Sequence, residues 1–185
     1  MSAPIAGVLS SLERVLLDRD TIQRRVADLA KQIEEDYAGR ELFVLALMDG
    51  AIFFVADLLR HINLPVKLHT LSVSSYHGGT SSSGRVQMLQ GLPANLRGQD
   101  VLLIDDILDT GLTLATVHDR ILEECQPQSL RVVVLLSKDR QRVREAPAHY
   151  VGFEIADEFV VGYGMDYKGH YRNLPCIGIL NPTHI

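Results

Sequence analysis

Cysteine is scarce in this chain. Its 185 residues include only Cys125 and Cys176, which stand far apart and belong to no Cys-x-x-Cys or Cys/His pattern. Small disulfide scaffolds and zinc modules carry more cysteines at short, regular spacings. We therefore expect two buried free thiols in a reducing compartment, and neither a structural disulfide nor a zinc site.

The chain also lacks an excess of basic residues and a long apolar segment. Lys and Arg number 18 against 23 Asp and Glu, so the formal net charge is -5 and no basic footprint for nucleic acid is expected. The longest nearly apolar window, Leu42 to Ala56, is broken by Asp49 and Gly50 and is too short to span a membrane. Residues 1–17 lack the basic start and long apolar core of a signal peptide. These features predict a cytoplasmic protein that binds neither nucleic acid nor membrane.

Two common nucleotide-binding motifs are missing. The sequence has no Gly-Lys dipeptide, which excludes a Walker P-loop, and Gly162-Tyr163-Gly164 lacks the third glycine of a dinucleotide-binding fingerprint. ATP hydrolysis and NAD binding therefore lose their main support in the sequence.

Apolar runs alternate with amphipathic segments over the first two-thirds of the chain. Helices are predicted from about Asp20 or Thr21 to Gly39, from Ala51 to Ile62 and from Leu114 to Cys125. Strands are predicted at 42–48, 66–74 with a bulge near Thr70, 101–104, 130–136, 151–155, 159–162 and 177–180. With no linker-like segment, this order predicts a single α/β domain over residues 1–185, with a mainly parallel sheet and helices on both faces.

Residues 101–113 carry the strongest chemical pattern, Val-Leu-Leu-Ile-Asp-Asp-Ile-Leu-Asp-Thr-Gly-Leu-Thr. The aliphatic start predicts a buried strand, followed by an acidic loop and the start of a helix. Ligands of open parallel sheets bind beyond the carboxyl ends of the strands. Backbone N–H groups of Thr110 to Thr113 would lack acceptors within the helix there, and Gly111 permits close approach, so we expect a phosphate site.

Three carboxylates, Asp105, Asp106 and Asp109, fall within five residues of this stretch. Such a group is costly without a cation or polyol hydroxyls beside it. Magnesium prefers oxygen ligands and often binds through one or two carboxylates together with substrate phosphates. The pattern predicts a phosphorylated sugar bound with Mg²⁺, although isolated Asp-Thr-Gly sequences are commonly ordinary turns and helix caps.

The stretch resembles the phosphoribosyl pyrophosphate (PRPP) signature of type I phosphoribosyltransferases. Asp109 before Thr110-Gly111 is similar to the hypoxanthine-guanine branch, because adenine and orotate enzymes usually carry Ala or Thr there. The resemblance runs from about Leu42 to Asn173 and includes Ser74-Ser75-Tyr76, Lys138, Val151-Gly152-Phe153-Glu154, Asp166-Tyr167 and Arg172. It implies a parallel core at about 40–140 and a small hood lobe from about 1–20 and 150–185.

The resemblance also implies purine salvage, in which hypoxanthine or guanine displaces pyrophosphate from PRPP to give IMP or GMP. It makes Asp109 the general acid/base at purine N7. The implied contacts are Asp109, Thr110, Gly111, Leu112 and Thr113 for the 5′-phosphate, Asp105 and Asp106 for ribose and Mg²⁺, Asp166 for a second Mg²⁺, Lys138, Phe159 and Val160 for the purine, and Gly50 and Arg172 for pyrophosphate.

Residue chemistry agrees with this division of roles. The Lys138 ammonium is a donor suited to a carbonyl oxygen, which favours hypoxanthine or guanine over adenine, and the Phe159 ring offers a stacking face. Taken alone, however, Lys138 could be a solvated charge and Phe159 a core residue. The polar, glycine-rich segment 75–85 predicts either a plain hairpin loop or a lid carrying Ser75 and Tyr76.

The sequence departs from the family pattern at three positions. In related enzymes the turn at Met48-Asp49-Gly50 often reads Leu-Lys-Gly or Leu-Arg-Gly and meets pyrophosphate through a cis peptide. Asp49 here would repel pyrophosphate, so we expect its side chain to point away or to act through water or a metal ion, and only Gly50 and the backbone to keep the family role. Asp105 replaces a commoner Glu, and Leu112 replaces a frequently polar residue.

Two alternatives share the phosphate loop. One is a phosphoribosyltransferase for another base, such as xanthine or a pyrimidine, and the other is a PRPP-sensing regulator that binds RNA. The acidic net charge, Lys138, Phe159 and Asp109 favour catalysis. Because relatives usually form dimers or tetramers, a homodimer or homotetramer is expected.

Overall fold

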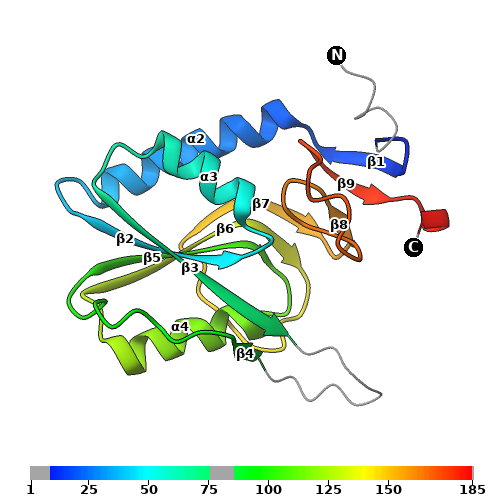
Figure 1. Cartoon of the computed structure of the whole chain (residues 1–185). Helices are drawn as coiled ribbons and strands as arrows, with labels where there is room; N and C mark the ends of the chain where they lie inside the picture. Colours follow the sequence, from blue (N-terminus) through cyan, green and yellow to red (C-terminus); the bar gives the residue numbers. More distant parts are fainter. Residues whose placement is uncertain (1–8, 76–85, 185) are drawn as a thin grey trace.

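A six-stranded sheet forms the centre of the molecule in the computed structural model, which describes residues 9–75 and 86–184 (Figure 1). The strands lie in the order β4-β3-β2-β5-β6-β7. Their bounds are β2 (Leu42–Met48), β3 (Val66–Ser75), β4 (Val86–Met88), β5 (Asp100–Leu108), β6 (Ser129–Asp139) and β7 (Tyr150–Ala156). Five strands are parallel and β4 is antiparallel at one edge, which confirms the predicted α/β architecture.

Helices cover both faces of this sheet. Side chains of β2 alternate between the faces: Leu42 and Val44 pack in one apolar cluster with α2 (Arg19–Asp36) and α3 (Ile52–His61), whereas Phe43 packs in the other with α4 (Leu112–Cys125). The two faces are thus both buried, which explains why the strands read as continuous apolar runs.

Some predicted boundaries were wrong. Helix α2 begins earlier than predicted, because Asp18 is its N-cap and accepts a 2.7 Å hydrogen bond from the Thr21 N–H. Strands β2 and β3 pair in unbroken register from Leu42 opposite Val66 onward, so the described strand has no bulge near Thr70.

A small antiparallel sheet is built from segments near both chain ends. It contains β1 (Leu12–Leu17), β9 (Ile177–Leu180) and β8 (Val160–Val161) in the order β1-β9-β8, and Figure 1 shows it beside the carboxyl ends of β2 and β7. Residues 150–156, expected in this lobe, instead form the edge strand of the large sheet, because β7 pairs in parallel with β6.

Two expectations from composition can be examined in the fold. Cys125 and Cys176 are free and buried, as predicted. Within the two described ranges, no helix combines the length and apolarity needed to cross a bilayer.

Candidate active site

Strand β5 is longer than predicted, and this changes where the carboxylates lie. Its parallel pairing with β6 continues through Asp105 opposite Val134 to Leu108 opposite Ser137. Asp105 and Asp106 therefore belong to the strand, and the acidic loop is reduced to the residues around Asp109. Since the carboxyl ends of parallel strands share one edge, this loop lies on the same side of the sheet as the ends of β2, β6 and β7.

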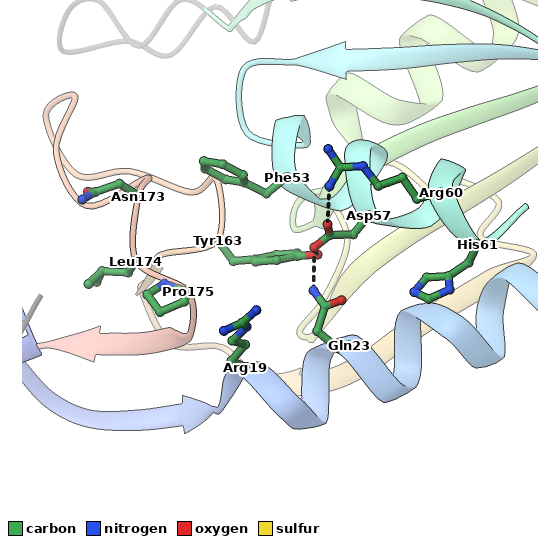
Figure 2. A pocket seen from close by; sticks show the side chains of 10 residues that line it. All are labelled: Arg19, Gln23, Phe53, Asp57, Arg60, His61, Tyr163, Asn173, Leu174 and Pro175. Carbon is green, nitrogen blue, oxygen red and sulfur yellow. Dashed lines mark hydrogen bonds and ion pairs between the residues drawn. The ribbon is translucent and has the colours of Figure 1, made fainter. Parts of the chain in front are cut away.

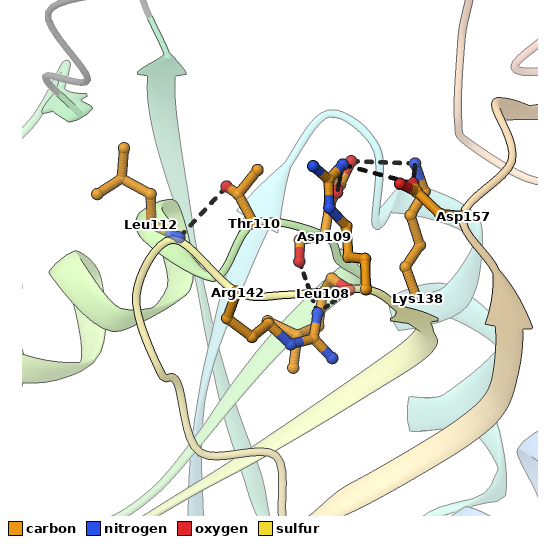
Figure 3. Close-up of polar contacts among 8 residues, drawn as sticks. Leu108, Asp109, Thr110, Leu112, Lys138, Arg142 and Asp157 are labelled. Carbon is orange, nitrogen blue, oxygen red and sulfur yellow. Dashed lines mark hydrogen bonds and ion pairs between the residues drawn. The ribbon is translucent and has the colours of Figure 1, made fainter.

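Asp109 and Lys138 form a close ion pair at this edge (Figure 3). The Lys138 Nζ lies 3.1 Å from Asp109 Oδ2 and 3.5 Å from Asp157 Oδ1, and only 9% of the lysine side chain is exposed. The Arg140 Nη1 lies 2.9 Å from Asp109 Oδ1 and 3.4 Å from Asp157 Oδ1. The positive charges of Lys138 and Arg140 thus balance the negative charges of Asp109 and Asp157. Sequence analysis did not single out Arg140 or Asp157; the only available signal was that each closely follows a predicted strand.

The loop before α4 is held by backbone contacts. Gly111 has φ of 79°, and a Cβ there would lie 2.0 Å from the Arg144 carbonyl oxygen, so only glycine fits. The Thr110 carbonyl accepts hydrogen bonds from the N–H groups of Val143 and Arg144, at 2.9 and 3.2 Å. Helix α4 starts at Leu112, slightly earlier than predicted, so the first-turn N–H groups of Leu112 and Thr113 face this loop.

The Arg142 side chain holds the same loop through hydrogen bonds. Its Nη1 donates to the carbonyl oxygens of Leu108 and Asp109, at 2.8 and 2.6 Å (Figure 3). Its Nη2 donates to Ser137 Oγ at 2.9 Å. The guanidinium therefore ties the end of β5 to the end of β6. Nothing in the local sequence pattern distinguished Arg142 from its charged neighbours.

Asp105 and Asp106 are adjacent acidic groups near the end of β5, and Asp105 is buried whereas Asp106 is partly buried. Burial raises the pKa of Asp105 well above its usual range, and the neighbouring Asp106 carboxyl raises it further. Burial also raises the pKa of Asp106, although hydrogen bonds and the Arg172 charge oppose this shift. In the described part of the chain, no group of three His, Cys, Asp or Glu side chains is placed to hold a metal. The pair could supply two oxygen ligands to a cation that takes its others elsewhere.

The turn after β2 packs against this pair without an intervening side chain. A Cβ on Gly50 would lie 2.0 Å from Asp106 Oδ2, and a Cβ on Gly164 would lie 1.9 Å from the Gly50 carbonyl oxygen. The Met48–Asp49 peptide is cis, and Asp49 is exposed. The structure thus brings Gly50 and Asp106 together, and it adds Gly164, which sequence analysis had considered only in rejecting a dinucleotide motif.

Arg172 and Asp166 join the group formed by Gly50 and Asp106. Arg172 Nη1 donates to the Gly164 carbonyl at 2.6 Å, and its Nη2 lies 2.9 Å from Asp166 Oδ1. The other Asp166 oxygen accepts from the Gly169 N–H at 2.7 Å. A cation, the partly buried carboxylates of Asp106 and Asp166, and a backbone turn therefore meet on one side of the site.

The remaining predicted contacts are less closely grouped. Phe159 is 49% exposed and lies edge-on to Tyr167, with ring centroids 5.8 Å apart, while Val160 is buried in β8. Ser75 ends β3, and Tyr76 lies outside the described residues, as does the rest of segment 76–85. Among the residues that the structure describes, no hydrogen bond, ion pair or ring contact joins Phe159 to the Asp109–Lys138 pair.

A cavity of about 520 Å³ lies between α2, α3 and the segment after β8 (Figure 2). Tyr163 forms part of its wall and donates a 2.6 Å hydrogen bond to Asp57 Oδ2. Burial, followed by this donation to a carboxylate, raises the pKa of Tyr163 far above its usual value. Neither residue was singled out from the sequence.

Comparisons with known proteins agree on one family. A family model described as phosphoribosyl transferase domain matches residues 16–168. The hypoxanthine-guanine phosphoribosyltransferase of Staphylococcus epidermidis is 44% identical over 169 residues, covering 91% of this chain and 94% of that protein. Its Staphylococcus aureus counterpart is 42% identical over 173 residues, covering 94% and 96%. A crystal structure of a hypoxanthine phosphoribosyltransferase from Staphylococcus aureus matches with a TM-score of 0.90 and 40% identity, covering 96% of each chain.

Proposed function

The chain belongs to the phosphoribosyltransferase family, and from that premise we propose that it transfers the 5-phosphoribosyl group of PRPP to hypoxanthine or guanine, giving IMP or GMP and pyrophosphate. The relatives named as hypoxanthine-guanine phosphoribosyltransferases support this choice of bases. The observation that carries the proposal is the Asp109–Lys138 pair beside the start of α4.

This pair suits the N7 and O6 edge of a 6-oxopurine. The two atoms are neighbours on the base, and the Lys138 ammonium and Asp109 carboxylate are neighbours on the protein, 3.1 Å apart. Lys138 donates to O6, whereas the exocyclic amino group of adenine would face it with a second donor. Asp109 takes the N7 proton as the glycosidic bond forms. Phe159 stacks on the ring, and the Val160 backbone meets the base edge.

The end of β5 and the loop between β5 and α4 would hold the phosphoribosyl group. First-turn N–H groups of α4 and the hydroxyls of Thr110 and Thr113 receive the 5′-phosphate, aided by the positive end of the helix dipole. Asp105 and Asp106 face the ribose hydroxyls. Their negative charge also favours the positive character that the ribose gains as pyrophosphate departs.

The donor set fits Mg²⁺. Asp105 and Asp106 offer adjacent oxygen ligands whose charged forms are disfavoured by burial, and a divalent cation would favour those charged forms. When bound with PRPP, Mg²⁺ neutralises the charge that develops on the departing pyrophosphate. Gly50 and Arg172 contact pyrophosphate. Asp166 orients Arg172 through their 2.9 Å ion pair and would be a ligand of a second Mg²⁺.

Two further features complete the proposal. The enzyme is a homodimer or homotetramer. It works in the cytoplasm, a reducing compartment in which the buried free thiols of Cys125 and Cys176 persist.

An assay of the purified protein with PRPP, Mg²⁺ and one base at a time tests the proposal. We expect nucleotide from hypoxanthine and guanine, and far less from adenine. Product from xanthine alone would select the alternative base. Absence of product from every 6-oxopurine would contradict the proposed function.

A further inference from the structure

The pyrophosphate side of the site depends on a contact between two glycines. Gly164 has φ of 106°, and its missing Cβ would lie 1.9 Å from the Gly50 carbonyl oxygen. The Gly164 carbonyl oxygen accepts a 2.6 Å hydrogen bond from the Arg172 guanidinium. The position of Gly164 therefore sets how far Arg172 stands from the turn at Gly50.

Tyr163 fixes the backbone immediately before Gly164. Its φ of 49° is uncommon for a residue with a side chain, and its N–H donates to the Leu174 carbonyl at 2.9 Å. The side chain is only 5% exposed, and its ring lies 6.2 Å from that of Phe53. The phenol forms part of the wall of the 520 Å³ cavity and points toward Asp57 (Figure 2).

The Tyr163 hydroxyl forms a hydrogen bond with a residue of helix α3. It donates to Asp57 Oδ2 at 2.6 Å, and Gln23 Nε2 from α2 donates to the same oxygen, as Figure 2 shows. Arg60, one turn along α3, approaches the other Asp57 oxygen at 3.7 Å. This carboxylate therefore joins α2, α3 and the segment after β8.

Helix α3 and the Gly50 turn form one continuous unit. The Ile52 N–H donates to the Asp49 carbonyl at 3.2 Å, and the Val55 N–H donates to the Ala51 carbonyl at 2.8 Å, so the turn leads directly into the helix. Asp57 lies on this helix and Gly50 at its start. The segment after β8 consequently contacts this unit through the ring and the hydroxyl of Tyr163 and through the Gly164 backbone.

We infer that Tyr163, through its hydrogen bond to Asp57, is a positioning residue for pyrophosphate. The bond holds Gly164 and Arg172 against the turn that faces the leaving group. The inference rests on the proposed function, because it assigns Gly50 and Arg172 to pyrophosphate. Tyr163 touches neither the base nor the 5′-phosphate loop, so its effect falls on the affinity for PRPP and pyrophosphate alone.

Tyr163→Phe removes the hydroxyl and keeps the ring on Phe53. The KM for PRPP and the inhibition constant of pyrophosphate should each rise about tenfold, the effect of losing one hydrogen bond to a charged group. The KM for hypoxanthine and the Kd for IMP should stay within about twofold. Asp57→Asn retains an acceptor oxygen and should preserve most of the PRPP affinity, whereas Asp57→Leu should reproduce the defect.

Tyr150→Phe is a matched control at the opposite end of the sheet. Tyr150 is also 5% exposed and donates a 2.6 Å hydrogen bond to an aspartate, Asp36, but it has no connection to Gly164. The Tyr150→Phe variant should lose about as much stability as Tyr163→Phe and should leave the KM for PRPP unchanged. Equal changes in both tyrosine variants, or an unchanged KM for PRPP in an active Tyr163→Phe enzyme, would overturn the inference. A wild-type protein without transferase activity would overturn the proposed function instead.

Discussion

Asp109 has donors on both carboxylate oxygens, Lys138 on one and Arg140 on the other. Such a side chain has a fixed orientation before any base arrives, which general acid/base transfer requires.

Replacing Asp109 by Asn keeps the shape of the side chain and removes its ability to take a proton. We expect kcat to fall by about 10²-fold or more, with the Kd for IMP little changed. Steady-state kinetics and calorimetric titration with IMP measure the two quantities. Asp157→Asn is the control, since Asp157 also contacts Lys138 but is given no proton to carry; it should lose less than about tenfold in kcat. An Asp109→Asn enzyme with wild-type turnover would remove the residue from that role.

At the scale of single residues, the sequence revealed neighbours in the chain better than neighbours in space. Asp105, Asp106 and Asp109 could be grouped because they share one short stretch. Arg142 and Asp157 could not, because their partners lie on other strands and a linear pattern does not say which charges will face one another. Gly164 escaped notice because its requirement is a close backbone approach to Gly50, which no local pattern encodes.

Among the secondary-structure elements, the loop after β6 has a structural role that its sequence conceals. Arg142 in this loop donates to the Leu108 and Asp109 carbonyls and to Ser137, whereas Arg144 reaches outward to Asp119 on α4. Both arginines look alike in the sequence. Only the first supports the end of β5.

Arg142→Met should therefore lower both stability and turnover. Losing charged hydrogen bonds to carbonyls that have few other donors should reduce the free energy of unfolding by about 1.5–3 kcal/mol, and the freed Asp109 backbone should reduce kcat severalfold. Urea denaturation and steady-state kinetics test this. Arg144→Met removes an exposed ion pair and should change stability by less than about 1 kcal/mol. If the two variants behave alike, Arg142 does not support the loop.

Most strands and helices were predictable, and the error at the end of β5 has a physical cause. Apolar periodicity located the helices α2, α3 and α4 and the five parallel strands of the large sheet, because burial on both faces imposes it. The end of β5 was missed because Asp105 and Asp106 oppose strand propensity locally. Pairing with β6 extends the strand despite that propensity. The sequence of β5 alone does not show which strand it pairs with or how far the pairing continues.

For the molecule as a whole, the buried acidic pair makes stability depend on pH. The pKa of Asp105 is raised in the folded state above its unfolded value, so the folded protein binds more protons between those two values. Stability from this source is complete below the unfolded pKa, near 3.8, and is lost as the pH rises through the folded pKa.

Asp105→Asn should accordingly stabilise the ligand-free protein more at pH 7.5 than at pH 4.5. Each unit of raised pKa corresponds to about 1.4 kcal/mol of that difference. Urea denaturation of wild type and variant across this range provides the measurement. Asp28→Asn, an exposed change on α2, serves as control and should show no such trend. A stability gain that is independent of pH would contradict the account.

The small sheet gives the molecule an order of assembly during synthesis. Strand β9 pairs with β1 and β8, and it follows all the other strands in the chain. A nascent chain can therefore complete the parallel core and the loop before α4 while β8 still lacks its neighbour. The loop around Asp109 can then form first, whereas β8, which precedes the segment carrying Gly164 and Arg172, gains its partner β9 only after Leu180 has been synthesised.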